Sequence, residues 1–317
     1  MKNDIRYISH REIDDKKWDR CIAASVNGNL YAYSWYLNLV CERWGALVEG
    51  DYARVFPLPI RRKAFTNYVY MPAFTQQLGL FSIPHLGVEH TTAFLQALPA
   101  SISYLDLNLN TLNKVEGHYE TRVNTNYELE LISTYEKIRA AYAENTRRNI
   151  AAAEKARLEW VNHVSPAEVI DLFRWNRGKQ LGAFGKKEYA LLERLLHRLM
   201  HQRRLSISGA IGGPNQLLAG LVIAETDNRS VLIFSATERR SENYGALPWL
   251  IDRYIRAQSE THRILDFEGS NDPGLARFYK GFGARETSYL RLIIDRLNPL
   301  QRAGLQLSRK LKGKTGL

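Results

Sequence analysis

The spacing of apolar and polar residues changes several times between a helical and a strand-like period. In the first part of the chain it predicts helices over 14–24, 34–44 and 90–98. Between the second and third helices, the stretch GALVEGDYARVFPLPIRR indicates two strands joined by a Gly-Asp turn. Pro57 and Pro59 are expected to limit the second of these strands to a sheet edge or a short run, since proline has no N–H to donate. The alternating stretches SISYLDLNLN and YELEL predict two further strands.

The second part of the chain has a more regular order of elements. The pattern predicts helices over 133–157, 166–179 and 187–203, with the strand LEWVNHV after the first helix. The strands LSISGAI, QLLAGLVIAE and SVLIFSAT follow, joined by tight turns, and then come the helix ALPWLIDRYIRAQSE and the stretch RILDFEGSNDPGLARFYKGFGARE. Tight turns indicate an antiparallel meander, and a helix leading to a further strand makes the sheet mixed. The sequence therefore predicts an α+β fold.

Composition sets the size of the protein and one expectation about its location. The 317 residues, 45% of them hydrophobic, are enough for two cores, and we expect halves at 1–130 and 131–296 with a basic helix or tail at 297–317. There is no apolar run of about 18 residues, the N-terminus is charged, and there are two cysteines. These features favour a reduced, cytoplasmic protein. His197 and His201 have a metal-like spacing but no third ligand, so no metal is expected.

The formal net charge of +11 is concentrated in two places. Residues 137–204 contain 15 Lys and Arg against 7 Asp and Glu, and residues 296–317 contain 6 Lys and Arg and no acids. Such a distribution suits RNA, a phosphate-rich ligand or an anionic membrane surface. A solvated, solubilising face explains it equally well.

The order of elements in the second half resembles that of the GNAT acyltransferases, and two motifs agree with it. LARFYKGFG resembles the family's helix that ends in glycine, which places Tyr279 where a tyrosine protonates the departing thiolate. RRSENYGALPWLIDRYI lies where the family has its phosphate loop. The resemblance implies an acyl-CoA site at Arg239, Arg240, Asn243, Tyr244, Gly245 and Ala246. In that loop Asn243 replaces a glycine of the family pattern.

A closer resemblance is to the tandem-GNAT aminoacyltransferases, which include the Fem-type enzymes of peptidoglycan bridges and the leucyl/phenylalanyl-tRNA–protein transferases. It is carried by YAENTRRNIAAAEKARLEWV and by LDFEGS followed by FYKGFG. The enzymes that use aminoacyl-tRNA have Asp-x-Gln at the strand end, whereas this chain has Asp266-Phe-Glu268. The resemblance implies tandem GNAT-like domains, with the acyl-donor site in the C-terminal half. Arg147 and Arg148 would then contact RNA or a phosphorylated acceptor.

Acyl transfer to an amine requires a base, a stabilised oxyanion and a proton for the leaving group. If Asp266 and Glu268 alternate along a strand, they share a face, and the pKa of one would rise enough to make it a general base. Lys280 would stabilise negative charge and Tyr279 would donate a proton. Without catalysis, one carboxylate caps the next helix, Tyr279 packs and Lys280 is solvated.

Together these features predict a GNAT-type N-acyltransferase. The donor would be an acyl-CoA such as acetyl-CoA, or an aminoacyl-tRNA, and the acceptor a small-molecule or peptide amine. tRNA is a possible partner, and the basic tail suggests peripheral membrane contact. The alternative is a catalytically silent GNAT-like module that binds RNA, a nucleotide or a membrane surface.

Overall fold

A computed structural model describes the whole chain except residues 1–3, 64–65, 179–183, 240–243, 270 and 303–317. The chain forms two compact units, the first from residues 1–124 and 288–317 and the second from residues 125–287. This division differs from the boundaries expected at 130 and 296. The difference arises from β13 (Arg285–Asp295), whose residues 291–295 pair with β6 (Ile102–Asn108) of the first unit.

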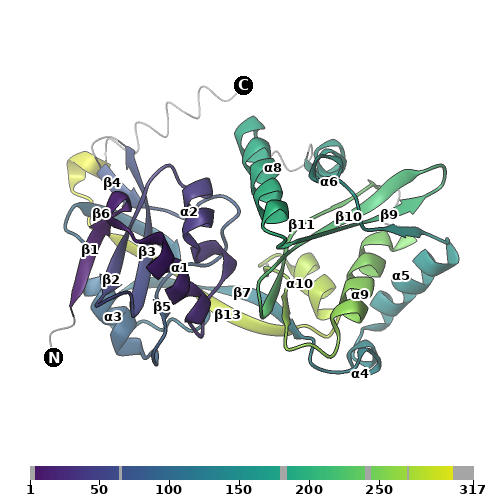
Figure 1. Cartoon of the computed structure of the whole chain (residues 1–317), viewed down its shortest axis with the longest axis horizontal. Coiled ribbons are helices and arrows are strands. Elements are labelled where there is room, and N and C mark those ends of the chain that lie inside the picture. The colour runs from purple at the N-terminus through teal and green to yellow at the C-terminus, as the bar shows by residue number, and fades with distance from the viewer. Residues whose placement is uncertain (1–3, 64–65, 179–183, 240–243, 270, 303–317) are drawn as a thin grey trace. The chain divides into compact units, whose positions relative to one another are not determined.

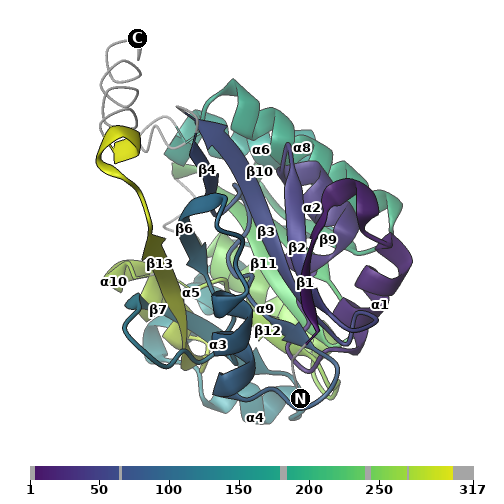
Figure 2. The ribbon, with the colours of Figure 1, turned by 90° about the vertical axis from the view of Figure 1, so that its left-hand side faces the viewer.

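The first unit contains a sheet with short helices beside it (Figures 1 and 2). Besides β6 and β13, its elements are β1 (Ile5–Ser9), η1 (His10–Glu12), α1 (Asp15–Ala24), η2 (Leu30–Ala32), α2 (Ser34–Val40), β2 (Trp44–Glu49), β3 (Arg54–Lys63), β4 (Thr66–Val69), β5 (Phe81–Ser82) and α3 (Val88–Gln96). The sheet order is β1-β2-β3-β4-β6-β13, with β5 paired to β3. Among the described strand pairs of this unit, only β4–β6 is parallel, so its sheet is mixed and mostly antiparallel.

Helix α1 shows how local sequence and core packing agree in this unit. The Asp14 side chain accepts hydrogen bonds from the N–H groups of Lys16 and Lys17, and so caps the helix where the pattern placed its start. One turn later, Trp18 is fully buried, and its ring centroid lies 4.9 Å from that of Trp44 on β2. The expected helix is therefore confirmed, and its apolar face is held by the sheet.

The two prolines of β3 do not place it at a sheet edge. Pro57 and Pro59 lie opposite Ala46 and Trp44 in an antiparallel ladder with β2. On its other side, β3 pairs with β5 at residues 54–55 and with β4 at residues 60–63. The prolines thus fall in a gap between these two short pairings, where no described strand needs their missing N–H. The expectation of an edge strand was wrong because the sequence does not show where neighbouring strands stop.

The second unit carries the longer helices. Its elements are β7 (Glu120–Glu130), α4 (Tyr135–Ala140), α5 (Glu144–Lys155), β8 (Glu159–Val161), α6 (Pro166–Phe173), η3 (the π-helical turn Arg174–Gly178), α8 (Lys186–His201), β9 (Leu205–Gly212), β10 (Gln216–Glu225), β11 (Arg229–Thr237), α9 (Ala246–Gln258), β12 (Ile264–Asp266) and α10 (Pro273–Lys280). The sheet order is β7-β12-β11-β10-β9-β8, and β11–β12 is its only parallel pair among the described residues.

Helices cover both faces of this second sheet (Figure 1). Residues of α4, α5, α9 and α10 form one hydrophobic core with β7 and with β9 to β12. Helices α6 and α8 contact the sheet from the other side. The fold class is α+β with mixed sheets flanked by helices, as the patterns predicted. No helix among the described residues is long and apolar enough to cross a bilayer.

The expected single helix over 133–157 is two helices in the structure. It breaks between α4 and α5, where the N–H of Ala143 donates to the carbonyl oxygen of Gly281 instead of to its own helix. Helix α4 begins at Tyr135, two residues after the expected start, and its N-cap Thr134 makes no side-chain hydrogen bond. The break is a tertiary effect, because residues 141–143 contain no proline or glycine.

Candidate functional site

The second sheet opens between its two parallel strands. β11 and β12 pair only from Arg229 opposite Ile264 to Val231 opposite Asp266. β11 continues to Thr237 alongside β10, with a register shift that leaves Ile233 out of the ladder. On the other side of the opening, the N–H of Phe267 still bonds to Tyr127 of β7. Beyond Val231, no described strand pairs with this side of β11, so its backbone groups face the opening.

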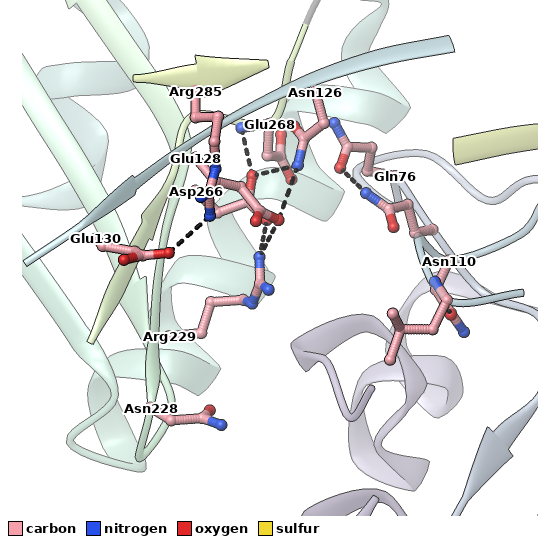
Figure 3. A network of polar contacts seen from close by, with 12 residues as sticks. Gln76, Asn110, Asn126, Glu128, Glu130, Asn228, Arg229, Asp266, Glu268 and Arg285 are labelled. Atoms are coloured by element: carbon pink, nitrogen blue, oxygen red, sulfur yellow. Dashed lines mark hydrogen bonds and ion pairs between the residues drawn. The ribbon is translucent and has the colours of Figure 1, made fainter. Parts of the chain in front are cut away.

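Asp266 ends β12 at the point where the strands separate, and both of its oxygens have partners (Figure 3). Arg229 Nη1 lies 2.7 Å from its Oδ2, and Asn126 Nδ2 lies 3.1 Å from its Oδ1. The backbone N–H of Glu268 donates to the same Oδ1 at 2.9 Å. Asp266 is 4% exposed. It is thus held rigidly, and it fixes the backbone of the second carboxylate residue.

Arg229 joins Asp266 to a third acidic residue, Glu128 on β7. Its Nη1 lies 2.8 Å from Glu128 Oε1, and the Glu128 and Asp266 side chains are only 11% and 6% exposed. Burial alone would lower the pKa of Arg229, but the two carboxylates outweigh it and raise the pKa above its usual range. Two carboxylates and one guanidinium form a buried cluster that carries a formal excess of negative charge.

Glu268 does not share a strand face with Asp266, so that expectation was wrong. β12 ends at Asp266, and Glu268 has a φ of 57°, in the left-handed region. Gly269 follows with a φ of 35°, and a Cβ there would collide with the backbone of Thr125 and Asn126. β7 approaches so closely here that position 269 has no room for a side chain. A glutamate in a left-handed conformation is strained, and such strain is concentrated at functional positions.

Tyr279 and Lys280 end α10 but differ in surroundings. The Tyr279 ring stacks on Phe267, with centroids 5.0 Å apart and an interplanar angle of 28°. It therefore packs beside the residue that follows Asp266. Lys280 has a side chain that is 53% exposed, and its Nζ lies 2.7 Å from Glu286 Oε2. Lys280 is thus an ion-paired surface residue, not the buried lysine that oxyanion stabilisation would favour.

The proposed phosphate loop before α9 is only partly described, since Arg240 and Asn243 lie outside the described residues. Gly245 has a φ of 66°, and a Cβ there would collide with the carbonyl oxygen of Asn149 on α5. Ala246 is 1% exposed, while Tyr244 is exposed. The small residues Gly245 and Ala246 are explained by the contact between α9 and α5. Binding of a cofactor by this loop stays a prediction.

Arg239, at the start of that loop, is tied to the π-helical turn. The backbone N–H of Arg239 donates to Asn176 Oδ1 at 3.3 Å, while Asn176 Nδ2 donates to the carbonyl oxygen of Leu172. π-helical turns are rare and frequently occur at functional sites. The Arg239 side chain is exposed.

Arg147 and Arg148 lie on the exposed part of α5, and neither forms an ion pair among the described residues. Arg147 Nη1 donates to the carbonyl oxygen of Tyr142 at 2.6 Å, and Arg148 Nη2 donates to Asn145 Oδ1 at 2.8 Å. Arg147 also lines an open groove of about 650 Å³ with Arg139 and Arg256. The groove contains acidic residues too, so it is not a purely basic surface.

Sequence reasoning missed the residues that hold Asp266 in place. The alternating pattern places Glu128 only in a strand and leaves Asn126 just before it, and the turn signal places Arg229 only at a turn. A carboxylate that is buried at a strand end requires a cation or hydrogen-bond donors nearby. This requirement is the one signal in the sequence that could have prompted a search for the partners of Asp266. The described residues contain no group of three or more His, Cys, Asp or Glu side chains arranged to hold a metal ion.

Comparisons with known proteins reveal relatives by structure alone. No protein-family model matches the sequence, and no curated protein matches it. Among solved structures, FemX is 11% identical and superimposes with a TM-score of 0.64 over 90% of this chain and 96% of its own. The chain has the fold of FemX. The expected fold is therefore confirmed.

Two further solved structures superimpose on this chain over nearly their whole length. L-PGS from Bacillus licheniformis is 10% identical, with a TM-score of 0.52 over 93% of this chain and 96% of its own. A conserved protein of unknown function from Bacteroides thetaiotaomicron is 11% identical, with a TM-score of 0.55 over 92% of this chain and 100% of its own. At such low identity these likenesses establish the fold and leave the reaction to be argued from the site.

Proposed function

We propose that this protein is an N-acyltransferase that transfers an acyl or aminoacyl group to an amine at the opening between β11 and β12. The observation that carries the proposal is this opening beside the buried Asp266 cluster, within a Fem-type GNAT-like fold. The likeness to FemX and L-PGS supports the class of reaction. The donor is an acyl-CoA or an aminoacyl-tRNA, and the acceptor is a small-molecule or peptide amine.

The separated edge of β11 suits an extended acyl donor. Its backbone N–H and C=O groups beyond Val231 have no paired strand on that side among the described residues. An extended amide-containing chain can bond to such an edge as an added strand would. In this proposal the donor lies along β11, and its carbonyl carbon is delivered near the end of β12.

The acidic residues would act on the acceptor amine. The excess negative charge of Arg229, Glu128 and Asp266 attracts an ammonium group, which must lose a proton before it attacks the carbonyl. Asp266 is the positioning residue in this scheme, because Arg229 and Asn126 already occupy its oxygens. Glu268, held by Asp266 through its backbone, would be the base.

Tyr279 would supply the proton for the leaving group. Its ring stacks on Phe267, directly between Asp266 and Glu268 in sequence. A tyrosine hydroxyl can donate a proton to a departing thiolate of coenzyme A or to the departing ribose oxygen of a tRNA. Lys280 contributes positive charge at the exposed end of α10, where it pairs with Glu286.

The decisive experiment supplies donors to the purified protein with a panel of amines, and detects the acylated product by mass spectrometry. The donors are acetyl-CoA and charged tRNA. Glu268→Gln and Tyr279→Phe should each slow transfer by about 100-fold or more. Glu130→Gln is the matched control and should leave transfer unchanged. Glu130 lies on the same strand as Glu128, but its side chain is exposed and pairs with Arg285. If transfer survives both substitutions, the reaction does not take place at this opening. If the wild-type protein binds a donor but transfers nothing, the catalytically silent GNAT-like module is favoured.

A further inference from the structure

A second hollow lies on the far side of the second sheet from Asp266. It has a volume of about 380 Å³ and is formed by β8, β9 and α9, with Trp160, Asn162, Glu225 and Arg253 among its lining residues. None of its lining residues belongs to the cluster around Asp266, and its Glu225 lies on β10, two strands from β12 in the sheet order. This pocket is therefore distinct from the proposed transfer site.

The positive group of the pocket is held by aromatic rings. The Arg253 guanidinium carbon lies 5.0 Å from the centroid of the Trp160 ring and 5.2 Å from that of the Trp249 ring. In the described part of the chain, no carboxylate lies within ion-pairing distance of Arg253. Indole rings attract and orient a guanidinium without neutralising its charge. Its N–H donors thus remain suited to a carboxylate from outside the chain.

The negative group is held by a neutral hydroxyl. Glu225 Oε1 accepts a hydrogen bond of 2.8 Å from the hydroxyl of Tyr254, whose oxygen also lies 2.8 Å from Ser230 Oγ. Within the described ranges, Glu225 has no side-chain ion pair with Lys, Arg or His. Tyr254 is 8% exposed, so this anchor is rigid. Its carboxylate lines the same hollow as Arg253.

We infer that this pocket binds a zwitterionic α-amino acid. The ligand's carboxylate would bond to Arg253 and its ammonium group to Glu225, while Leu205, Ile207 and Ala257 provide an apolar wall for its side chain. A volume of about 380 Å³ is in the range of small-molecule sites. A polyphosphate is disfavoured because Glu225 repels it, and a neutral hydrophobic molecule would leave both charges unpaired. The inference does not depend on the proposed transferase activity.

L-leucine and three analogues, each of which lacks one charge or the apolar side chain, test the inference. L-leucine, N-acetyl-L-leucine, L-leucinamide and glycine are titrated into the full chain by isothermal calorimetry, and thermal unfolding is followed in parallel. We expect L-leucine to bind at least tenfold more tightly than each of the other three. N-acetylation removes the ammonium group, amidation removes the carboxylate, and glycine lacks the apolar side chain.

Two conservative substitutions then assign each charge to its residue. Glu225→Gln should abolish the preference for L-leucine over its N-acetyl form, because glutamine still accepts from Tyr254 but carries no charge. Arg253→Gln should abolish the preference over L-leucinamide. Arg256→Gln, one turn further along α9 and outside this pocket, is the control and should bind as the wild type does.

The inference is overturned if none of the twenty common L-amino acids binds the wild-type chain, or if both variants keep the wild-type preferences. Cooperative unfolding of each variant, followed by circular dichroism, confirms that it is folded. Because Glu225 and Arg253 lie outside the transfer site, loss of binding with transfer intact, or the reverse, tells the two proposals apart.

Discussion

Arg229 Nη1 lies 2.7 Å from Asp266 Oδ2, and this ion pair joins the start of β11 to the end of β12. The two residues are 37 positions apart in sequence, with all of α9 between them. Arg229 lies at the first position of the short parallel ladder between the two strands, and Asp266 lies at the last position, directly before the strands separate. The ion pair therefore defines where the sheet opens, and it also fixes the carboxylate beside that opening.

Removing the guanidinium should destabilise the second unit strongly. Arg229→Met would leave Glu128 and Asp266 buried together without their cation, and loss of one partner from such a buried group costs about 3–5 kcal/mol. The free energy of unfolding from urea denaturation measures the loss. The control is Arg285→Met, whose ion pair with Glu130 is 69% and 56% exposed and should contribute at most about 1 kcal/mol. Equal losses in the two variants would mean that the buried cluster does not hold the strands together.

The left-handed conformation of Glu268 separates its role in stability from its role in transfer. Glu268→Gly and Glu268→Ala both remove the carboxylate, but only glycine adopts a φ of 57° without strain. The glycine variant should therefore be more stable than the alanine variant by about 1 kcal/mol. Both should lose transferase activity to the same extent. An alanine variant that is active would show that Glu268 is not the base.

Gly245 should be far less tolerant of a side chain than a glycine with similar backbone angles. Gly245→Ala places a Cβ against the carbonyl oxygen of Asn149, whereas at Gly213, with a φ of 54°, a Cβ would meet nothing within 4 Å. Gly213→Ala should cost only the conformational penalty, about 1–2 kcal/mol. Gly245→Ala should cost about 1–3 kcal/mol more, through overpacking between α9 and α5. Thermal or urea unfolding of the two variants compares them directly, and equal costs would refute the close helix contact.

The Lys280–Glu286 ion pair should make the folding stability depend on pH in a defined direction. The hydrogen bond and charge of Lys280 lower the pKa of Glu286. Since its folded-state pKa lies below the unfolded value, Glu286 contributes stability above the unfolded value, about 4.3, and this contribution is lost as the pH falls through the folded pKa. In Lys280→Met, the pKa of Glu286 should rise toward its ordinary value.

Carbon-13 NMR titration of the Glu286 carboxyl group measures this change. Lys280→Arg is the matched control and should keep the pKa low, because an arginine retains the charge. Since both side chains are about half exposed, roughly 1 M salt should also reduce the shift in the wild-type protein. A pKa that is unchanged in Lys280→Met would mean that the ion pair does not form in solution.

Several local features could be predicted from sequence because neighbouring residues produce them. Asp14 caps α1 where expected, and the three-strand meander of β9, β10 and β11 follows the tight turns between its strands. The expected strand ends at Asp266, and the expected helix follows as α10, which begins at Pro273. The hydrophobic period, the capping residues and the turn residues each act over a few positions, so they can be recognised in the sequence without knowledge of the fold.

Other features depended on contacts that local patterns do not encode. The expected helix over 133–157 is broken where Ala143 bonds to Gly281, and the strand ends before Glu268, where Gly269 packs against the backbone of Asn126. Lys280 lies at the surface because Glu286 on the next strand pairs with it there. In each case a tertiary contact overrode the local period.

The sequence by itself determined the α+β class, the order of strands and helices, and the short segment in which Asp266, Glu268, Tyr279 and Lys280 lie together. Only the tertiary structure decided how that segment is held. Asn126, 140 positions away from Asp266, and Arg229, 37 positions away, reach the same carboxylate because β7, β12 and β11 are adjacent in the sheet. Strand order and register arise from the burial of a whole sheet face between helices. The residues that fix the carboxylate could therefore be identified only once that sheet had formed.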